Sequence, residues 1–582
     1  MDVSAEKMVW ALLVLAVGAA CWTASRWRRT KAPGSLKPFS AMPAPPQTFP
    51  FGNLPDLTKG KRLQFHLVLH NWALQLGPVF RYNVLGSWKV VVLDPAVLPA
   101  IIGRPGLPKS KMYKKFRELC AWSDDFLFTR LDVHDAHWKS SRKTLARAFS
   151  ADEIRKKFGA TTDAALELAT KLSALPPGTA VEAQDAMHRV TMDVTLTAGF
   201  GIPSNAVALF GRPVPVLEAL HYVYKQSSLR VTNPLVCLYE RWLPFLPAAR
   251  ENRRRHFHLY KMYEDMYDQL EAKWPVAEDD NSMWGCLKRI EDPVTGKPLS
   301  RAQLVPEMAG IFLGALDTTG QTCAITLGLI AGHPEVQRRL AEELGTRGLL
   351  ATPANPVPRR PEPEDLAALP YLEAVLRESL RLLPVSAVGM QRATAAPVTD
   401  LGGYAVPANT DVLAFVYGLQ HSSKYWDAPE AFRPERWLTP APASKARFNF
   451  PATNGKAEDG GAARSNLSNA SRSGAEPRAT KWMSAAADAQ DGRKAAFLPF
   501  SGGPMDCLGQ RLAMMEAPLI LAILLGRFEA ELDESMGGVE GMLARQCNTF
   551  TIAIDQGLHM KFKPRAGWLP EPAAHQGLRS KE

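Results

Sequence analysis

The feature that most constrains the fold of this chain is a long apolar segment that ends just before His333. It reads LVPEMAGIFLGALDTTGQTCAITLGLIAG over residues 304–332, and apolar side chains fall on nearly every side of the helix it would form. A helix that is apolar all round is stable only when protein surrounds it. Ser300 and Gln303 fit a capping box at its start. The sequence therefore predicts a long helix that crosses the interior of a large domain.

The rest of the chain can supply such a domain. Of its 582 residues 46% are hydrophobic, so it can bury a large core. Residues 135–345 have a mostly helical pattern, and further helices are predicted over 370–383 and 512–528. Residues 79–94 alternate apolar and polar side chains around a Gly-Ser turn, which predicts a β-hairpin. The expected fold is mainly α with small β-sheets.

Two stretches depart from this pattern. Residues 439–494 are rich in Ala, Gly, Ser, Asn and Lys and contain few large apolar side chains. Such a composition cannot bury enough surface to become ordered, so we expect a low-complexity, disordered insertion at the surface. Residues 571–582 are expected to form a flexible tail, which leaves 55–570 as the main domain.

The chain begins with an uncharged apolar run from Met8 to Ser25, close to the minimum length for a membrane-spanning helix. Basic residues, which mark the cytoplasmic flank of a span, follow it at Arg26, Arg28, Arg29 and Lys31. We expect residues 1–31 to form a single membrane anchor that leaves the main domain in the cytosol. A cleaved secretory signal or a plastid transit peptide is the alternative, but the run is long for the first and lacks the amphipathicity of the second.

Residues 32–54 follow the expected anchor and are rich in proline. Proline cannot continue a helix and favours extended backbone. This stretch is therefore expected to be a semi-rigid hinge between the membrane and the main domain.

Charge and cysteine content argue against several classes of protein. The 69 Lys and Arg exceed the 58 Asp and Glu by a formal charge of +11, which is modest for this length. No zinc-finger spacing or basic stripe is present, so nucleic acid is not expected as a partner. The 7 Cys are scattered and odd in number, which argues against a disulfide framework and a structural zinc site. A reducing compartment is the simplest interpretation.

One cysteine differs from the other six in its surroundings. Cys507 follows a glycine-rich turn in FLPFSGGPMDCLGQRLAMMEA, residues 497–517, and a helix is predicted directly after it. Glycines let the backbone turn tightly and approach a flat ligand. Backbone N–H groups at a helix start stabilise a thiolate, and a thiolate can bind haem iron. The alternative is a glycine-rich turn whose cysteine only packs in the core.

The segment FSGGPMDCLG, residues 500–509, closely resembles the cysteine loop of the cytochrome P450 family. The resemblance implies a cytochrome P450 fold and haem b (iron protoporphyrin IX), with Cys507 as the axial iron ligand. It also places Phe500, Gly503 and Gly509 around the cofactor. The chain departs from the family at Met505, where a basic residue usually binds a haem propionate and where methionine cannot do so.

Further motifs of the family occur in its order along the chain. Glu378 and Arg381 lie three residues apart on the predicted helix 370–383, and Arg436 follows in FRPERW, residues 432–437. By resemblance, these three residues form a buried ionic triad behind the haem, with a structural role. Taken alone, an ExxR pair is a common surface feature of helices.

An acid and an alcohol, Asp317 and Thr318, lie midway along the long apolar helix. Polar groups in such a helix are costly unless they have partners or a task. In the family this pair delivers protons during oxygen activation, which would make Asp317 the relay and Thr318 the group that holds water. The alternative is a threonine that bonds to its own helix and an aspartate at a kink.

The motif WKSSR, residues 138–142, resembles the helix of the family that binds a haem propionate. The resemblance implies that Trp138 and Arg142 make charge-assisted hydrogen bonds to that group. Arg392 follows the segment 384–391, where the family often places another propionate ligand. With Met505 silent, Arg142 and Arg392 would carry more of the anchoring.

These motifs imply a monooxygenase that inserts one oxygen atom from O2 into an apolar substrate such as a lipid, sterol or terpenoid. Electrons would come from an NADPH-cytochrome reductase, because no flavin or dinucleotide motif is evident in the sequence. The expected location is the endoplasmic reticulum membrane, with a plastid membrane as the less favoured alternative. A haem-thiolate isomerase or dehydratase that acts on an oxygenated lipid without O2 or reductase is the alternative activity, but the intact acid–alcohol pair favours oxygen activation.

By resemblance, the substrate pocket would be lined by parts of 112–130, 215–245, 309–318, 384–390 and 548–552. Side chains expected there are Phe126, Phe128, Val385, Val388, Phe550 and Ile552. This composition favours an apolar ligand.

Overall fold

The computed structural model describes most of the chain, with gaps. The described residues are 36–58, 63–104, 106–114, 125–232, 242–243, 245–273, 280–438, 495–549 and 551–569. The predicted anchor (1–31), the predicted insertion (439–494) and the predicted tail (571–582) lie outside them.

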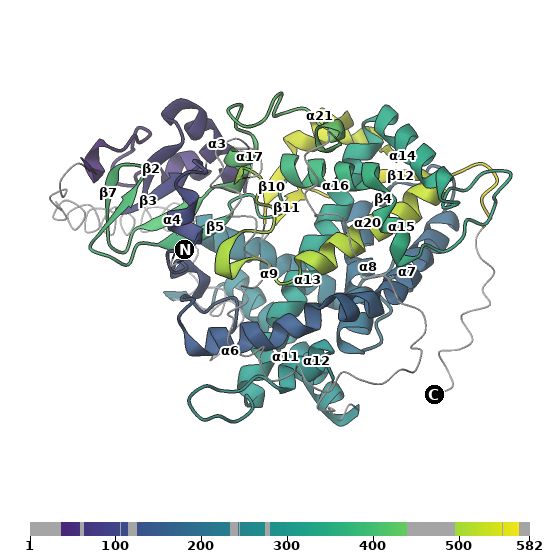
Figure 1. Cartoon of the computed structure of the whole chain (residues 1–582), viewed down its shortest axis with the longest axis horizontal. Coiled ribbons are helices and arrows are strands. Elements are labelled where there is room, and N and C mark those ends of the chain that lie inside the picture. Colours follow the sequence, from purple (N-terminus) through teal and green to yellow (C-terminus); the bar gives the residue numbers. More distant parts are fainter. Residues whose placement is uncertain are drawn as a thin grey trace, which may run out of the picture.

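Helices dominate the described residues, as Figure 1 shows. The α-helices are α2 (Leu54–Thr58), α3 (Phe65–Leu76), α4 (Leu98–Ile102), α6 (Ala136–Leu145), α7 (Ala151–Ser173), α8 (Ala183–Asp193), α9 (Pro215–Thr232), α11 (Pro247–Lys273), α12 (Met283–Lys288), α13 (Arg301–Ala331), α14 (Pro334–Thr346), α15 (Pro363–Ala367), α16 (Pro370–Leu382), α17 (Val416–Gln420), α20 (Gln510–Arg527) and α21 (Gly538–Ala544). Shorter helical turns are η1 (Phe39–Ala41), η2 (Ala146–Phe149), η3 (Val194–Phe200, a π-helix), η4 (Pro434–Trp437), η7 (Gly503–Met505) and η8 (Glu534–Met536).

The strands of the described residues form four small sheets. The strands are β1 (Lys37–Pro38), β2 (Val79–Val84), β3 (Ser87–Val92), β4 (Val181–Glu182), β5 (Met390–Ala393), β6 (Val398–Leu401), β7 (Tyr404–Pro407), β8 (Asp411–Ala414), β9 (Phe528–Leu532), β10 (Gln546–Asn548), β11 (Ile552–Ile554) and β12 (His559–Pro564). Their orders are β1-β7-β6, β2-β3-β8-β5, β4-β12-β9 and β10-β11. The mainly α fold with small sheets is confirmed.

The long apolar helix is α13, and it runs through the centre of the molecule (Figure 1). Helices α8 and α20 pack against it, and most of its side chains are buried. The Ser300 N–H donates to Gln303 Oε1 at 2.9 Å just before the helix begins. The prediction of a buried helix that crosses the interior is confirmed, and α13 brings Asp317 and Thr318 to the middle of the fold.

The other predicted elements also form. The hairpin consists of β2 and β3, which pair antiparallel from Val79 opposite Val92 to Val84 opposite Ser87. The predicted helices over 370–383 and 512–528 are α16 and α20. Strands β8 and β5 extend the hairpin's sheet: β8 pairs parallel with β3, and β5, which follows α16, pairs antiparallel with β8.

The proline-rich stretch differs from the expected hinge in its described part. Strand β1 pairs parallel with β7, and Met42 is only 2% exposed in the core. The Arg81 guanidinium donates to Ser40 O at 2.9 Å, which fixes this stretch to β2. Prolines exclude helix but do not prevent extended backbone from joining a sheet edge. Residues 36–54 are therefore part of the folded body rather than a spacer outside it.

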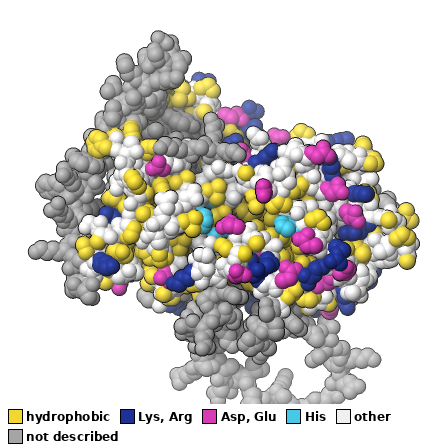
Figure 2. Space-filling model, turned by 90° about the horizontal axis from the view of Figure 1, so that it is seen from above, with side chains coloured by type: hydrophobic (Ala, Val, Ile, Leu, Met, Phe, Trp, Pro, Cys, Tyr) yellow, Lys and Arg dark blue, Asp and Glu magenta, His cyan; other side chains and the backbone are white. Residues whose placement is uncertain are grey.

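Within the described residues, no helix combines the length and the apolar character needed to cross a bilayer. On the face shown in Figure 2, described side chains of both charges are interspersed with apolar ones.

Candidate active site

An internal cavity of about 480 Å³ lies beside the middle of α13. Its lining is mostly apolar, and three of the sequence motifs meet at it. Helix α13 contributes Thr318, helix α6 contributes Trp138 and Arg142, and the loop before α20 contributes Cys507. Segments that are far apart in the sequence therefore converge on one cavity.

Cys507 lines this cavity, and its side chain is exposed to solvent in the structure. Its backbone N–H donates to Phe500 O at 3.0 Å, which closes the loop, and α20 begins three residues later at Gln510. Burial raises the pKa of the Cys507 thiol, while the N–H groups of Gly509 and Gln510 and the nearby Arg142 guanidinium favour the thiolate. The thiol thus has both access to the cavity and donors arranged around its sulfur.

The two glycines predicted to surround a cofactor have different positions. Gly509 lines the cavity beside Cys507. Gly503 is not among the described cavity-lining residues; it has φ +75°, and a Cβ there would lie 1.7 Å from Ile102 O. Gly503 therefore lets the loop dock closely against the end of α4. Phe500 lines the cavity as expected.

Three cationic side chains line one part of the cavity: Lys109, Arg142 and Arg392. Arg142 donates to Asp506 O at 2.6 Å and forms an ion pair with the Asp506 carboxylate. Arg392 is 3% exposed and makes no ion pair with any described residue; its Nε has no hydrogen-bond partner there. Burial lowers the pKa of Lys109 to about 7, with Arg392 and Arg142 acting in the same direction. Arg142 therefore has a counter-charge in Asp506, whereas Arg392 and Lys109 form no ion pair among the described residues.

Met505 occupies the space beside Arg392. The Arg392 Nη1 lies 3.1 Å from Met505 Sδ, a weak acceptor that cannot neutralise a guanidinium. A ligand that carries both an iron atom and carboxylates could bind the Cys507 thiolate through its iron and the nearby cations through its carboxylates. The residues present therefore fit haem, whose propionates would supply the missing negative charge near Arg392 and Lys109.

The two residues of the acid–alcohol pair, Asp317 and Thr318, have different surroundings. Thr318 lines the cavity, and its hydroxyl donates to Gly314 O at 2.6 Å, one turn earlier in α13. Asp317 is 2% exposed and is not among the described cavity-lining residues. Its carboxylate faces His188 on α8 and accepts a hydrogen bond from Thr551. The two neighbours thus face different parts of the interior.

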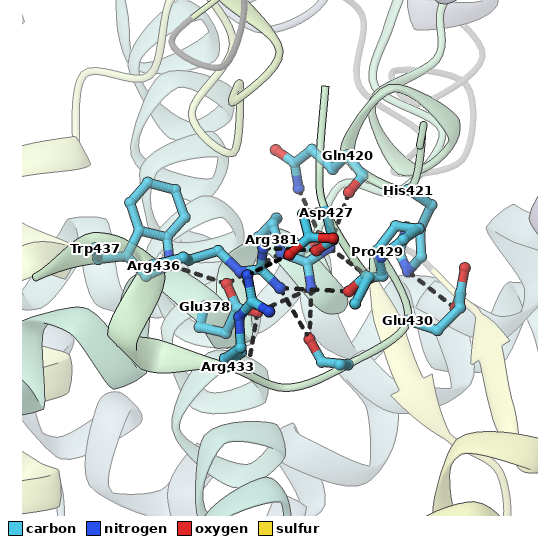
Figure 3. Close-up of polar contacts among 12 residues, drawn as sticks. Glu378, Arg381, Gln420, His421, Asp427, Pro429, Glu430, Arg433, Arg436 and Trp437 are labelled. Carbon is cyan, nitrogen blue, oxygen red and sulfur yellow. Dashed lines mark hydrogen bonds and ion pairs between the residues drawn. The ribbon is translucent and has the colours of Figure 1, made fainter. Parts of the chain in front are cut away.

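The ionic triad is brought together where α16, which carries Glu378 and Arg381, meets η4, which carries Arg436 (Figure 3). The Arg381 Nη2 donates to Glu378 Oε1 at 2.9 Å, and the Arg436 Nε donates to the same oxygen at 2.9 Å. The sequence did not indicate that Trp437 Nε1 also donates to Glu378, at 2.9 Å to Oε2 (Figure 3). Arg381 is fully buried and gives its remaining N–H groups to backbone oxygens of Gln420, Pro429 and Ala431.

The expected pocket side chains fall into three groups. Phe126, Phe128, Val385 and Val388 line the cavity. Ile552 does not, because it is buried in β11. Phe550 lies outside the described residues, and no described residue of 215–245 is among the cavity-lining ones.

Several ionisable residues that line the cavity were missed from the sequence, among them Lys109 and Glu307. Lys109 had no motif around it that could have indicated its position. Glu307 lies on α13 with its carboxylate accepting from Leu127 N–H at 3.0 Å and Ser141 Oγ at 2.9 Å, and burial raises its pKa. Glu307, like Asp317, is an acid in an apolar helix, where a charged side chain needs partners, so the sequence offered the same signal for both residues.

Comparison with known proteins leads to the same family as the cysteine loop. The family model described as cytochrome P450 matches residues 42–452 and 478–540. The cyclooctat-9-en-7-ol 5-monooxygenase of Streptomyces melanosporofaciens is 26% identical, over 66% of this chain and 69% of its own. The carotene epsilon-monooxygenase, chloroplastic, of Arabidopsis thaliana is 24% identical, over 86% and 82%. A bifunctional cytochrome P450/NADPH–P450 reductase of Bacillus subtilis is 24% identical over 85% of this chain, which spans 40% of that protein.

The match covers most of the chain and most of the residues that line the cavity; Asn548, Thr549 and Thr551 lie beyond it. The protein belongs to the cytochrome P450 family and is an oxidoreductase of the monooxygenase class with haem as its cofactor.

Proposed function

We propose that the protein inserts one oxygen atom from O2 into an apolar substrate, with Cys507 as the axial ligand of its haem. The observation that carries this proposal is that Cys507 and Thr318 both line one mostly apolar cavity. The haem, when bound, supplies the oxygen-activating chemistry. The protein's own part is to hold the cofactor, exclude water and control protons.

Individual side chains have distinct parts in this proposal. Arg142, Trp138 and Arg392 hold the haem carboxylates by charge-assisted hydrogen bonds. Thr318 orients water in the cavity, and Asp317 supplies protons from behind it. The triad of Glu378, Arg381 and Arg436 has a structural part, because it ties α16 to η4 at a distance from the cavity lining.

The substrate proposed is a hydrocarbon-rich molecule of the lipid, sterol or terpenoid kind. Phe126, Phe128, Val385 and Val388 give the cavity an apolar wall that suits such a skeleton. The names of two relatives refer to carotene and to cyclooctat-9-en-7-ol, which are of the same general character. Screening such compounds for shifts of the haem absorption spectrum would rank candidate substrates.

Electrons are proposed to come from NADPH through a separate reductase. One relative carries a P450 and an NADPH–P450 reductase in a single chain, which supports this type of donor. The alternative of an isomerase or dehydratase needs neither NADPH nor O2. Product formation from an oxygenated lipid alone, without NADPH, would overturn the monooxygenase proposal in favour of it.

The proposed location is a membrane, with residues 1–31 as the anchor. The endoplasmic reticulum was the expected membrane, and the chloroplastic name of one relative makes a plastid membrane the alternative that a test must include. The two membranes can be distinguished by fluorescence microscopy. The full chain is fused at its C-terminus to a fluorescent protein and imaged together with markers for the endoplasmic reticulum and the plastid.

The ligand assignment is tested by spectroscopy of Cys507→Ala against Cys547→Ala. Cys547 is a buried cysteine in β10, so its substitution is a control for loss of a thiol that is not in the cavity. The reduced, CO-treated wild type and Cys547→Ala should show the absorption band of thiolate-ligated haem, and Cys507→Ala should lose it. A thiolate band that persists in Cys507→Ala would refute the assignment.

A further inference from the structure

A row of buried polar side chains in close contact lies behind Asp317, on the side of α13 that faces α8. The Asp317 carboxylate Oδ1 is 3.3 Å from His188 Nε2, and the two side chains are 2% and 1% exposed. A Cβ at Gly320 would lie 2.5 Å from His188 Cδ2, so this position on α13 leaves room for the imidazole only because it is glycine. Thr191 Oγ1 donates to Leu316 O at 2.9 Å and fixes α8 to α13 beside the pair.

The row continues outward through a second histidine. The His188 Nδ1 lies 3.0 Å from the Nε2 of His221, which is half-buried on α9. Burial lowers the pKa of His221 to about 4, His188 acts in the same direction, and Asp317 and Asp185 oppose it. Asp185 is 34% exposed and pairs with Arg189, so the outer end of the row is close to solvent. The row of contacts therefore extends from the buried Asp317 to His221, whose side chain is partly exposed.

The inner end of the row reaches the cavity through a threonine. The Thr551 Oγ1 donates to Asp317 Oδ2 at 2.6 Å, and Thr551 lines the cavity together with Thr318. Asp317 itself does not line the cavity, and the Thr318 hydroxyl is engaged with Gly314 O. Thr551, on the loop between β10 and β11, thus both hydrogen-bonds to Asp317 and lines the cavity.

We propose that His221 and His188 carry protons from the outer side of α9 to Asp317. Thr551 then passes these protons into the cavity. It is therefore a proton-transfer residue in addition to Asp317 and Thr318. This inference rests on the proposed monooxygenase function, because only a reaction that consumes protons in the cavity requires such a path.

The hydrogen-bond directions allow a balanced transfer. In the proposed starting state the His188 proton is on Nε2, which faces Asp317 Oδ1 at 3.3 Å. The His188 Nδ1 then accepts from the His221 Nε2–H, and the His221 Nδ1 is left to accept a proton from water. When a proton arrives there, His221 passes its Nε2 proton to His188, and His188 passes its own to Asp317. The neutral carboxyl then turns and donates to the Thr551 oxygen, whose hydroxyl proton moves to an acceptor in the cavity. One proton crosses, and each residue returns to its starting charge.

The first test changes the outer histidine and leaves Asp317 in place. His221→Gln keeps a hydrogen-bonding side chain that cannot relay a proton, and His221→Ala leaves space for added imidazole. Both variants should form product from NADPH about tenfold less efficiently, release the difference as peroxide, and show a larger solvent deuterium isotope effect. Added imidazole should restore the coupling of His221→Ala. His333→Gln is the control, since His333 makes a similar half-buried contact, to Leu329 O, at the far end of α13.

A second measurement is independent of turnover. Nitrogen-15 NMR of histidine-labelled protein, with each signal assigned by its loss in a single variant, reports which ring nitrogen carries the proton. His188 should carry it on Nε2, and its Nδ1 resonance should lose the hydrogen-bond shift in His221→Ala. A proton on Nδ1 of His188 would reverse the direction of the path and overturn the inference.

These results separate the inference from the function on which it rests. If the wild type couples NADPH to product and both His221 variants do so equally well, the proton path is refuted and the monooxygenase function stands. If the wild type forms product only from an oxygenated lipid without NADPH, the function itself fails, and the need for the path fails with it.

Discussion

At the scale of single residues, neighbours in the sequence have separate surroundings in the fold. Thr318 faces the cavity, whereas Asp317 turns toward α8. On a helix, successive side chains are rotated by about 100° around the axis, so adjacent residues cannot share one face. A motif of two adjacent residues therefore needs further groups to connect them, and here these groups come from α8 and from the loop after β10.

The Thr318 hydroxyl can be tested by Thr318→Ala. The variant should consume NADPH but divert most of it to peroxide, because the cavity loses a hydroxyl that orients water. Product formed per NADPH consumed is the measurement. Thr170→Ala is the matched control, since the Thr170 hydroxyl makes the same bond to the preceding turn, to Leu166 O at 3.0 Å, on an exposed helix face. Equal coupling in the two variants would contradict a role for Thr318.

The Arg392 guanidinium can be tested by Arg392→Met. A charge-assisted hydrogen bond contributes about 1.5–3 kcal/mol, so haem should dissociate roughly 10–100-fold faster from the variant. Transfer of haem to excess apomyoglobin measures this rate. Arg338→Met, at an exposed position on α14, is the control and should leave the rate unchanged.

Met505→Arg examines the same end of the cavity. The new guanidinium would lie beside that of Arg392 and would be stabilised only by a carboxylate between them. Haem retention should therefore be equal to or greater than that of the wild type. Faster haem loss would mean that Met505 is needed for packing at this position.

At the scale of elements, the triad links α16 to η4 by buried charge. Glu378→Gln would leave Arg381 and Arg436 buried without their counter-charge. Removal of one partner from a buried ion pair costs about 3–5 kcal/mol, so the free energy of unfolding should fall by an amount of that order. Urea unfolding of the haem-loaded protein measures it.

The control for Glu378→Gln is Glu342→Gln. Glu342 pairs with Arg338 on the exposed face of α14, with side chains 61% and 66% exposed. An exposed pair contributes about 1 kcal/mol or less, because solvent screens it. Losses of similar size in the two variants would contradict the structural role of the triad.

At the scale of the whole molecule, stability should depend on pH through the buried Glu516 of α20. Burial raises its pKa from 4.5 to about 8, and only Lys157 opposes this shift. Between these two values the folded protein holds a proton that the unfolded chain releases, so the free energy of unfolding falls as pH rises through this window. Glu516→Gln should remove the part of this decrease in the free energy of unfolding that comes from Glu516. Urea unfolding at pH values near 4.5 and near 8 measures the decrease. An unchanged pH dependence in the variant would contradict the raised pKa.

Much of the fold could be predicted because it depends on local pattern. The uniform apolar character of α13 indicated a buried helix, the alternation in β2 and β3 indicated a hairpin, and both form. The packing of residues 36–54 was not predicted, because strand pairing with β7 joins residues more than 350 positions apart. Composition excludes helix in this stretch but does not specify a partner strand.

The family, the cavity-facing Cys507 and the apolar walls of the pocket could be predicted from the sequence, because they depend on motifs and residue types along short segments. The charges that meet in the cavity, the role of Gly503 in loop packing and the contacts of Asp317 with His188 and Thr551 became visible in the folded structure. The reason is that hydrogen bonds and ion pairs act over a few ångströms in space, whereas their partners here come from α8, α9, α13 and a loop more than 200 residues away. No pattern along the chain encodes that proximity; the packing of α8 against α13 creates it.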